Sequence, residues 1–166
     1  AASLADAQQH GRRLRVRRLE SRPNLEGRAL AEQLARAGLD VELWVDAACY
    51  GAASGADLWL CGADSLTVDG VVNKVGTATL GIVGSALGVP GLVLCGTDKL
   101  WSASAPPPRI RPQPPGEVWP AAPSGVTVVN RYFDVTAWEH VAGVVTEEGV
   151  LTPQAAIERC LSEEMH

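Results

Sequence analysis

Apolar and polar positions change along the chain in blocks that favour helices and strands in turn. Within the segment 27–38, Leu30 and Leu34 recur at helical spacing, and the segment stops at Gly38, so we predict a helix there. The segment 40–46 instead alternates with a period of two, which is typical of a strand. The first half of the chain therefore reads as alternating strands and helices.

The continuous apolar run 91–95 indicates a strand that is covered on both faces of a sheet. The segment 57–61, with its short apolar run from Leu58 to Cys61, is predicted as another strand. Other elements predicted in this half are a strand at 14–19, a small-residue helix at 47–53 and a Gly- and Ala-rich helix at 74–88. Alternation of this kind predicts an α/β fold with a doubly wound, mostly parallel, Rossmann-like sheet flanked by helices. In such a sheet we expect 57–61 and 91–95 to be adjacent, buried and parallel.

A proline-rich stretch from residue 102 to 125 then breaks the pattern, because it holds eight of the eleven prolines of the chain. We expect a loop excursion outside the regular core. The elements predicted after it are a strand at 126–130, a helix from 136 to about 147 and a last helix at 154–164. For the second of these, Thr136 and Glu139 match a capping box.

Length and composition point to one globular domain covering residues 1–166, with 46% hydrophobic and 20% charged residues. No apolar run approaches the ~20 residues that a bilayer span needs, so we expect a cytoplasmic protein without membrane contact. The four cysteines are Cys49, Cys61, Cys95 and Cys160. None forms a C-x-x-C pair, so neither a metal site nor a disulfide scaffold is indicated, and we expect no cofactor.

The net charge is −5, and the charged residues are unevenly distributed along the chain. Residues 1–28 hold seven arginines against three acids, whereas residues 29–166 hold seven basic against sixteen acidic residues. The arginines at 12, 13, 15, 17 and 18 could suggest nucleic acid, but no aromatic residues are interleaved with them. Arginines at a sheet edge or a subunit contact explain the pattern equally well, so we expect no direct nucleic-acid binding.

The stretch 59–77 carries the candidate site. A short apolar run is followed by a turn that contains Asp64. A glycine-bearing loop then leads to Asn73 and Lys74, where we expect the helix 74–88 to begin. Ligands bind beyond the carboxyl ends of strands in open α/β sheets, and a helix start offers N–H groups to anions. An acid, an amide and an ammonium therefore converge where a phosphorylated small molecule could bind.

Several motifs occur in one order along the chain: Glu20-Ser21-Arg22-Pro23, Glu26-Gly27-Arg28, Asp46-Ala47-Ala48, Gly62-Ala63-Asp64, Asn73-Lys74-Val75-Gly76-Thr77, Gly88-Val89-Pro90, Phe133-Asp134-Val135-Thr136 and the run 146–153 (TEEGVLTP). Together they resemble the C-terminal domain shared by the alpha, beta and delta subunits of translation initiation factor 2B, methylthioribose-1-phosphate isomerase and ribose-1,5-bisphosphate isomerase. The resemblance runs from about Arg15 to the end of the chain, apart from the proline-rich excursion.

This resemblance implies a role for each matched position. Asp64 is similar to the acid that transfers a proton in an aldose–ketose isomerisation, and Asn73 and Lys74 match neighbours that hold the substrate. A carboxyl group in a partly desolvated crevice suits general acid–base work. From the residues alone, Asp64 could equally cap a turn, and Asp46 could line the crevice or cap the helix that follows it. Arg22 could contact a phosphate or brace its loop.

One departure from the family pattern bears on activity. The catalytic cysteine of the enzymes lies in a segment before the region where this sequence begins, and none of the four cysteines present matches it. An N-terminal helical domain of the family is likewise not in this sequence. We therefore expect a chain that binds ligand but is catalytically incomplete as it stands.

Two functions remain open on this basis. One is a sugar-phosphate-binding domain of the aldose–ketose isomerase type, with a phosphorylated sugar or nucleotide as ligand. The other is a non-catalytic regulatory or assembly subunit like those of initiation factor 2B. The resemblance also implies a homodimer or pairing with a related subunit, for which we expect Val129, Tyr132, Phe133 and Trp138 to face outward. A dinucleotide-binding domain is disfavoured, because no G-x-G-x-x-G follows the first strand.

Overall fold

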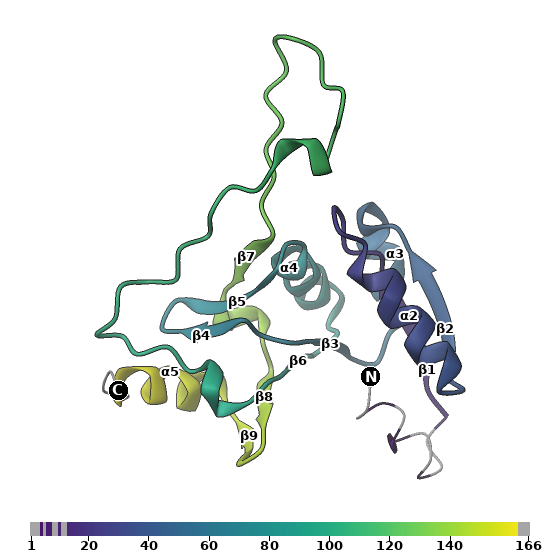
Figure 1. Ribbon diagram of the computed structural model, residues 1–166. Coiled ribbons are helices and arrows are strands. Elements are labelled where there is room, and N and C mark those ends of the chain that lie inside the picture. Colours follow the sequence, from purple (N-terminus) through teal and green to yellow (C-terminus); the bar gives the residue numbers. More distant parts are fainter. Residues whose placement is uncertain (1–3, 5, 8–9, 11–12, 163–166) are drawn as a thin grey trace. The chain divides into compact units, whose positions relative to one another are not determined.

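The computed structural model describes residues 4, 6–7, 10 and 13–162, and the chain divides into two compact units, Ala1–Ser54 and Gly55–His166. Each unit is described by itself. The fold is a mixed α/β fold with parallel sheet elements and four α-helices in the described residues (Figure 1). The finer prediction, a doubly wound Rossmann-like sheet, stays a prediction.

The first unit is a strand–helix–strand arrangement. Strands β1 (Arg15–Leu19) and β2 (Asp40–Trp44) pair in parallel, and helix α2 (Glu26–Arg36) connects them. The helix buries Leu34, of which 1% is exposed. A side chain at Gly27 would collide with the backbone of Leu19 and Glu20, so glycine is needed where α2 meets the end of β1. The 3-10 helix η1 (Asp46–Ala48) and helix α3 (Cys49–Ala53) follow β2.

The second unit contains the predicted parallel strands. Strands β3 (Trp59–Cys61), β6 (Gly91–Leu94) and β8 (Gly143–Thr146) are parallel in the order β3-β6-β8, and β9 (Gly149–Leu151) joins the edge antiparallel to β8. Trp59 pairs with Gly91, which confirms that the segments 57–61 and 91–95 are adjacent and parallel. The expected burial holds only in part, because Leu58 is 39% exposed. Val93 and Val144 are fully buried at the centre of this sheet.

Two helices pack against these strands. Helix α4 (Thr77–Leu87) contacts β3 and β7 (Phe133–Thr136), and helix α5 (Pro153–Ser162) contacts β8 and β9. The indole ring of Trp59 fills the space beside two backbone positions that carry no side chain. A Cβ built on Gly84 or Gly91 would lie 2.5 Å or 1.9 Å, respectively, from atoms of this ring.

A small antiparallel sheet in the same unit was not expected from the sequence. It consists of β4 (Ser65–Thr67), β5 (Gly70–Lys74) and β7, with β5 in the middle (Figure 1). The prediction that Asn73 and Lys74 open a helix is therefore wrong, because both residues end strand β5 and α4 begins only at Thr77. Asn73 pairs with Asp134 across the sheet, a partner that local sequence does not reveal.

The helix expected from 136 to about 147 is also wrong. Thr136 ends β7, where it pairs with Val71, and only the 3-10 helix η4 (Trp138–His140) separates it from β8. Trp138 is 8% exposed and its Nε1 donates to the carbonyl of Thr67, so it does not face outward. The burial of this ring holds the segment in an extended path instead of a helix.

The residues between 102 and 132 contain a 3-10 helix, η3 (Pro115–Glu117), and an isolated bridge between Pro112 and Arg131. The strand expected at 126–130 is wrong, because these residues belong to no strand of the structure. Val129 is 71% exposed in this segment, whereas Tyr132 and Phe133 are half-buried and meet edge to face with ring centroids 6.4 Å apart.

Among the described residues, every helix is too short or too polar to cross a lipid bilayer. The cytoplasmic location expected from the sequence stays a prediction.

Candidate functional site

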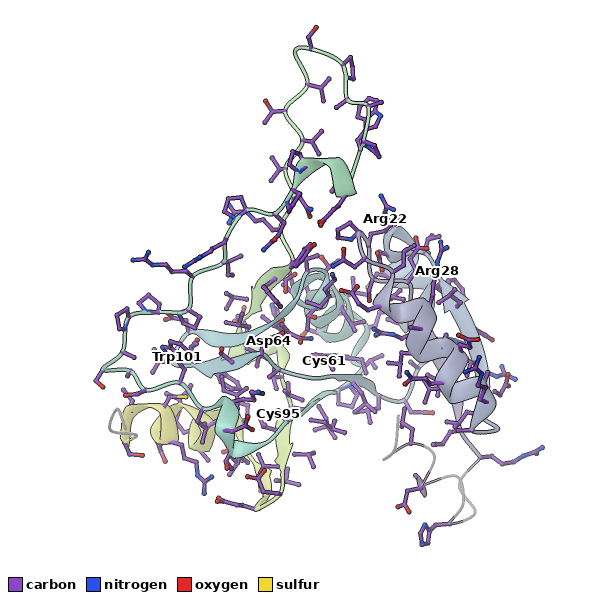
Figure 2. All side chains as sticks on the ribbon, viewed as in Figure 1. Arg22, Arg28, Cys61, Asp64, Cys95 and Trp101 are labelled. Atoms are coloured by element: carbon purple, nitrogen blue, oxygen red, sulfur yellow. The ribbon has the colours of Figure 1, made fainter. Side chains whose placement is uncertain are left out.

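The candidate site lies at the carboxyl ends of β3 and β6 in the second unit. Cys61 ends β3 and leads through Gly62 and Ala63 to Asp64, while β6 leads through Cys95 to the 3-10 helix η2 (Thr97–Lys99). Figure 2 shows Cys61, Asp64 and Cys95 on these neighbouring segments. This edge of a parallel sheet is where ligands bind in open α/β folds.

Asp64 lies directly next to β5. Its amide donates to the carbonyl of Val72 over 2.8 Å, which extends the pairing of β4 with β5 and sets Asp64 opposite Asn73. The Asp64 side chain is exposed and so accessible to a ligand, and it does not lie in the partly desolvated crevice considered from the sequence. On the far side of Asn73 lies Asp134, so the amide stands between two carboxylates on adjacent strands. The structure thus brings Asp64 and Asn73 together, as the sequence suggested.

The start of helix α4 is occupied by a carboxylate of the protein itself. Asp134 accepts hydrogen bonds from the amides of Gly76 over 2.7 Å and Ala78 over 3.2 Å. Burial raises the pKa of this carboxyl above its ordinary value, and the two amide hydrogen bonds act in the opposite direction. The expectation that these amides are available to an anionic ligand is therefore wrong, since Asp134 fills that position.

Lys74, the last residue of β5, places its ammonium over an aromatic ring. Its Nζ lies 4.8 Å from the ring centroid of Tyr132, within the range of a cation–π interaction. Asn73 is held differently, because its Nδ2 donates to Thr77 Oγ1 over 3.0 Å. As consecutive residues of one strand, the two side chains leave the sheet on opposite faces, so the convergence of Lys74 with Asp64 and Asn73 stays a prediction.

A second lysine at this edge, Lys99, was not singled out from the sequence. Its ammonium pairs with Asp98 over 2.9 Å, and the hydrogen bond and charge of Asp98 raise the pKa of Lys99, with a smaller contribution from the charge of Asp64. Lys99 follows the predicted strand 91–95 just as Asp64 follows 57–61. The rule that ligands bind at strand ends could therefore have identified it.

The turn that carries Lys99 is held by the end of β8. Glu147 follows this strand, and its carboxylate accepts hydrogen bonds from the amide and the hydroxyl of Thr97, the amide at 3.1 Å. These hydrogen bonds lower the pKa of Glu147. Three parallel strands therefore contribute to one edge: β3 supplies Asp64, β6 supplies Lys99, and β8 supplies the residue that fixes the turn before Lys99.

The two cysteines at this edge are not activated nucleophiles. Burial raises the pKa of Cys61 to about 12, with smaller contributions from Cys95 and Asp134. Burial and the nearby acids Asp98 and Glu147 raise the pKa of Cys95 to about 11. Thiols with such values are protonated at neutral pH, and the thiolate is the reactive form. Within the described part of the chain, no cluster of three or more His, Cys, Asp or Glu side chains is arranged to hold a metal ion.

Arg22 and Asp46 belong to the first unit, where they meet at the carboxyl ends of β1 and β2. The carboxylate of Asp46 accepts hydrogen bonds from the amides of Ser21 over 2.8 Å and Arg22 over 2.7 Å. Asp46 therefore holds the turn after β1, a role that neither of the two readings from the sequence included. The Arg22 side chain is exposed on this turn. Figure 2 labels Arg22 and, on α2, Arg28, which pairs with Glu20 over 2.7 Å.

Three arginines of the basic segment, Arg15, Arg17 and Arg18, make contacts within the first unit. Arg15 pairs with Asp40 over 3.1 Å, and Arg17 pairs with Glu42 over 3.3 Å. Arg18 donates to Ser21 Oγ, and burial lowers its pKa. Arg12 lies outside the described residues. These contacts agree with the structural explanation of the basic segment, and the expected absence of nucleic-acid binding stays a prediction.

Comparison with known proteins agrees with the resemblance found in the sequence. A family model described as the initiation factor 2 subunit family matches residues 1–153. A ribose 1,5-bisphosphate isomerase of Thermococcus kodakarensis is 31% identical over 93% of this chain and 51% of its own length. A methylthioribose-1-phosphate isomerase of Desulforudis audaxviator is 36% identical over 89% of this chain and 45% of its own length.

A solved structure shows the same similarity in three dimensions. The crystal structure of the delta subunit of translation initiation factor eIF-2B from A. fulgidus matches 92% of this chain and 47% of its own chain, with a TM-score of 0.84 and 30% identity. The chain therefore spans about half the length of the relatives that it matches.

Proposed function

This chain belongs to the initiation factor 2 subunit family, and we propose that its second unit binds a phosphorylated sugar in the manner of an aldose–ketose isomerase. The observation that carries the proposal is the placement of Asp64 after the carboxyl end of β3, opposite Asn73. The charge of Asp64 also acts on Lys99, which follows the carboxyl end of β6. The curated relatives named as isomerases of ribose 1,5-bisphosphate and methylthioribose 1-phosphate support the choice of ligand class.

Each residue has a defined part in this proposal. Asp64 is the exposed carboxyl group that exchanges a proton with the sugar, and Asn73 donates or accepts a hydrogen bond beside it. Lys74 and Lys99 are the two lysines of this unit, and in the proposal each acts on the phosphate as a point charge. Arg22 and Asp46 stay predictions from the resemblance, with Asp46 holding the turn that carries Arg22.

In this proposal the chain binds the sugar phosphate but does not catalyse its isomerisation. The family resemblance implies a catalytic cysteine, and the thiols at this edge, Cys61 and Cys95, are held in the protonated form by their raised pKa values. Residues 1–166 therefore bind ligand without turning it over, and turnover requires a thiol supplied from another segment or another chain.

The test compares binding of ribose 5-phosphate and AMP to the 166-residue chain and its variants by calorimetry. Lys74→Ala should weaken binding by about 1.5–3 kcal/mol, the size of a charge-assisted hydrogen bond. Asp64→Asn should bind nearly as well as the parent chain, because the amide keeps the shape of the carboxyl. Arg109→Ala is the matched control, since it removes one exposed positive charge from the proline-rich segment.

Two results would overturn parts of the proposal. Undiminished binding by the Lys74→Ala chain would remove Lys74 from the site. Isomerisation of a ribose phosphate by the 166-residue chain would show that it is not catalytically incomplete, and Asp64→Asn should then abolish that turnover.

The second candidate function is a regulatory or assembly subunit, favoured by the similarity to the delta subunit of eIF-2B. In this case the domain contacts related subunits and influences nucleotide exchange without sugar chemistry. Thermal unfolding distinguishes the two functions. A ligand at ~100 times its dissociation constant stabilises the folded state by about 2.7 kcal/mol, so ribose phosphates should raise the melting temperature only under the first function.

A further inference from the structure

The base of the proline-rich segment is joined by hydrogen bonds to the irregular segment that leads into β7. Glu117, at the end of η3, accepts two of them with the same oxygen, Oε2. One comes from the hydroxyl of Tyr132 over 2.6 Å and the other from Nδ2 of Asn130 over 2.8 Å. Asn130 is only 4% exposed, and its Nδ2 also donates to the carbonyl of Pro114 over 2.9 Å. These contacts fix Glu117 and Tyr132 relative to each other.

Tyr132 in turn contacts the proposed phosphate-binding lysine. Its ring lies under the ammonium of Lys74 at 4.8 Å, and its carbonyl accepts a hydrogen bond from the amide of Val75 over 2.7 Å. The ring is also packed edge to face against Phe133, with an interplanar angle of 76°. Backbone and side-chain contacts therefore hold the ring in one orientation beside the end of β5.

We propose that Tyr132 and Glu117 are positioning residues that hold the Lys74 ammonium ready for an anionic ligand; this inference rests on the proposed function, in which Lys74 binds phosphate. A lysine side chain loses much rotamer freedom when it is fixed, and a ring beneath the ammonium limits that freedom before the ligand arrives. The Tyr132 ring attracts the cation through its negative face.

Glu117 acts on Lys74 through the ring. A carboxylate that accepts a hydrogen bond from the phenol hydroxyl orients the ring and polarises the O–H bond, which makes the ring face more negative. The attraction of the ring for the ammonium then increases. The proline-rich segment supplies Glu117 and therefore contributes to ligand affinity, although neither Glu117 nor the rest of the segment needs to touch the ligand.

The experiment uses the fact that the chain contains two lysines, Lys74 and Lys99. Selective carbon-13 labelling of lysine gives two sets of side-chain NMR signals, and a Lys74→Ala chain assigns them. The ε-methylene protons of Lys74 should be shifted upfield by the ring current of Tyr132, and Lys99 serves as the internal reference. Tyr132→Leu should abolish the upfield shift, whereas Tyr132→Phe should keep most of it, because the ring remains.

Calorimetry with ribose 5-phosphate then measures the effect on binding. Tyr132→Leu should weaken binding about three- to tenfold, the range expected when a partly exposed cation–π contact is lost. Tyr132→Phe should weaken it less. Glu117→Ala should weaken binding in the parent chain and have no further effect in the Tyr132→Phe chain, because both changes remove the same hydrogen bond. Thermal melting of each variant verifies that it is folded.

The outcomes separate this inference from the proposed function. Absence of the upfield shift in the parent chain, or parent-like binding by a folded Tyr132→Leu chain when Lys74→Ala is weakened, overturns the inference and leaves the proposed function standing. Parent-like binding by Lys74→Ala removes Lys74 from the proposed site, and this inference, which depends on Lys74, is overturned with it. An additive loss in the double variant of Glu117 and Tyr132 overturns the part assigned to Glu117.

Discussion

Replacing Asp134 with alanine would remove the carboxylate that accepts the first amide hydrogens of helix α4. Two donors lose their partner, the amides of Gly76 at 2.7 Å and of Ala78 at 3.2 Å. A hydrogen bond to a charged group contributes about 1.5–3 kcal/mol, and loss of a helix N-cap costs about 0.5–2 kcal/mol. Because the carboxylate is half-buried, water replaces part of what is lost.

We therefore expect Asp134→Ala to lower the free energy of unfolding by about 2–3 kcal/mol, and Asp134→Asn by about 1 kcal/mol, since the amide oxygen still accepts one hydrogen bond. The assay is urea unfolding followed by tryptophan fluorescence, together with hydrogen exchange at the amides of Gly76 and Ala78. Asp69→Ala is the control, because it removes an exposed carboxylate from the same unit.

The pH dependence supplies an independent check on the same residue. The pKa of Asp134 is raised above its ordinary value of 3.8, so the folded chain binds the proton more tightly than the unfolded chain does. The contribution of this carboxyl to the free energy of unfolding is therefore largest below the ordinary pKa and decreases as pH rises through the raised value. The stability advantage of the parent chain over Asp134→Asn should decrease in that window. An advantage that grows with pH there would show that the two amide hydrogen bonds outweigh burial in setting this pKa. A fully stable Asp134→Ala chain with unchanged exchange at Ala78 would refute the role assigned to Asp134.

Two further predictions concern packing and assembly. Gly91→Ala should destabilise the chain by about 1–3 kcal/mol in urea unfolding, because the new methyl group collides with Trp59 and overpacks the core, whereas Gly116→Ala has open space around it and should change little. Sedimentation velocity at high micromolar concentration should show a dimer, with Val129 among the exposed apolar residues available to the contact. A monomer would contradict self-association, though not pairing with a different subunit.

The parts of the fold that follow from local pattern were predictable. The segments 57–61 and 91–95 became β3 and β6 in parallel register, since their apolar runs alternate with helical segments as in a parallel sheet. The position of Asp64 at the end of β3 followed from the same reasoning. Strand β5 was missed because its pairing with β7 joins residues that are far apart in the sequence, and nothing local to Asn73 indicates Asp134 as its neighbour.

The failure at Thr136 has a similar physical cause. Thr136 and Glu139 have the spacing of a capping box, but pairing with Val71 and the burial of Trp138 stabilise an extended path more than a helix. Lys99 and Tyr132 were missed as members of the site because their importance lies in what they contact. Those contacts depend on the turn after β6 and on the segment that precedes β7.

The fit of Trp59 between Gly84 and Gly91 has a consequence for how related sequences can diverge. The indole Nε1 has no hydrogen-bond partner in the described structure, so the position of the ring depends on the space that the two glycines leave. A substitution that first adds a side chain at either glycine makes it collide with the indole ring. A substitution that first replaces Trp59 with a smaller residue leaves a cavity and lowers the free energy of unfolding by about 3–5 kcal/mol. Neither order is neutral, so the three positions are expected to change together or to remain as they are over long evolutionary times.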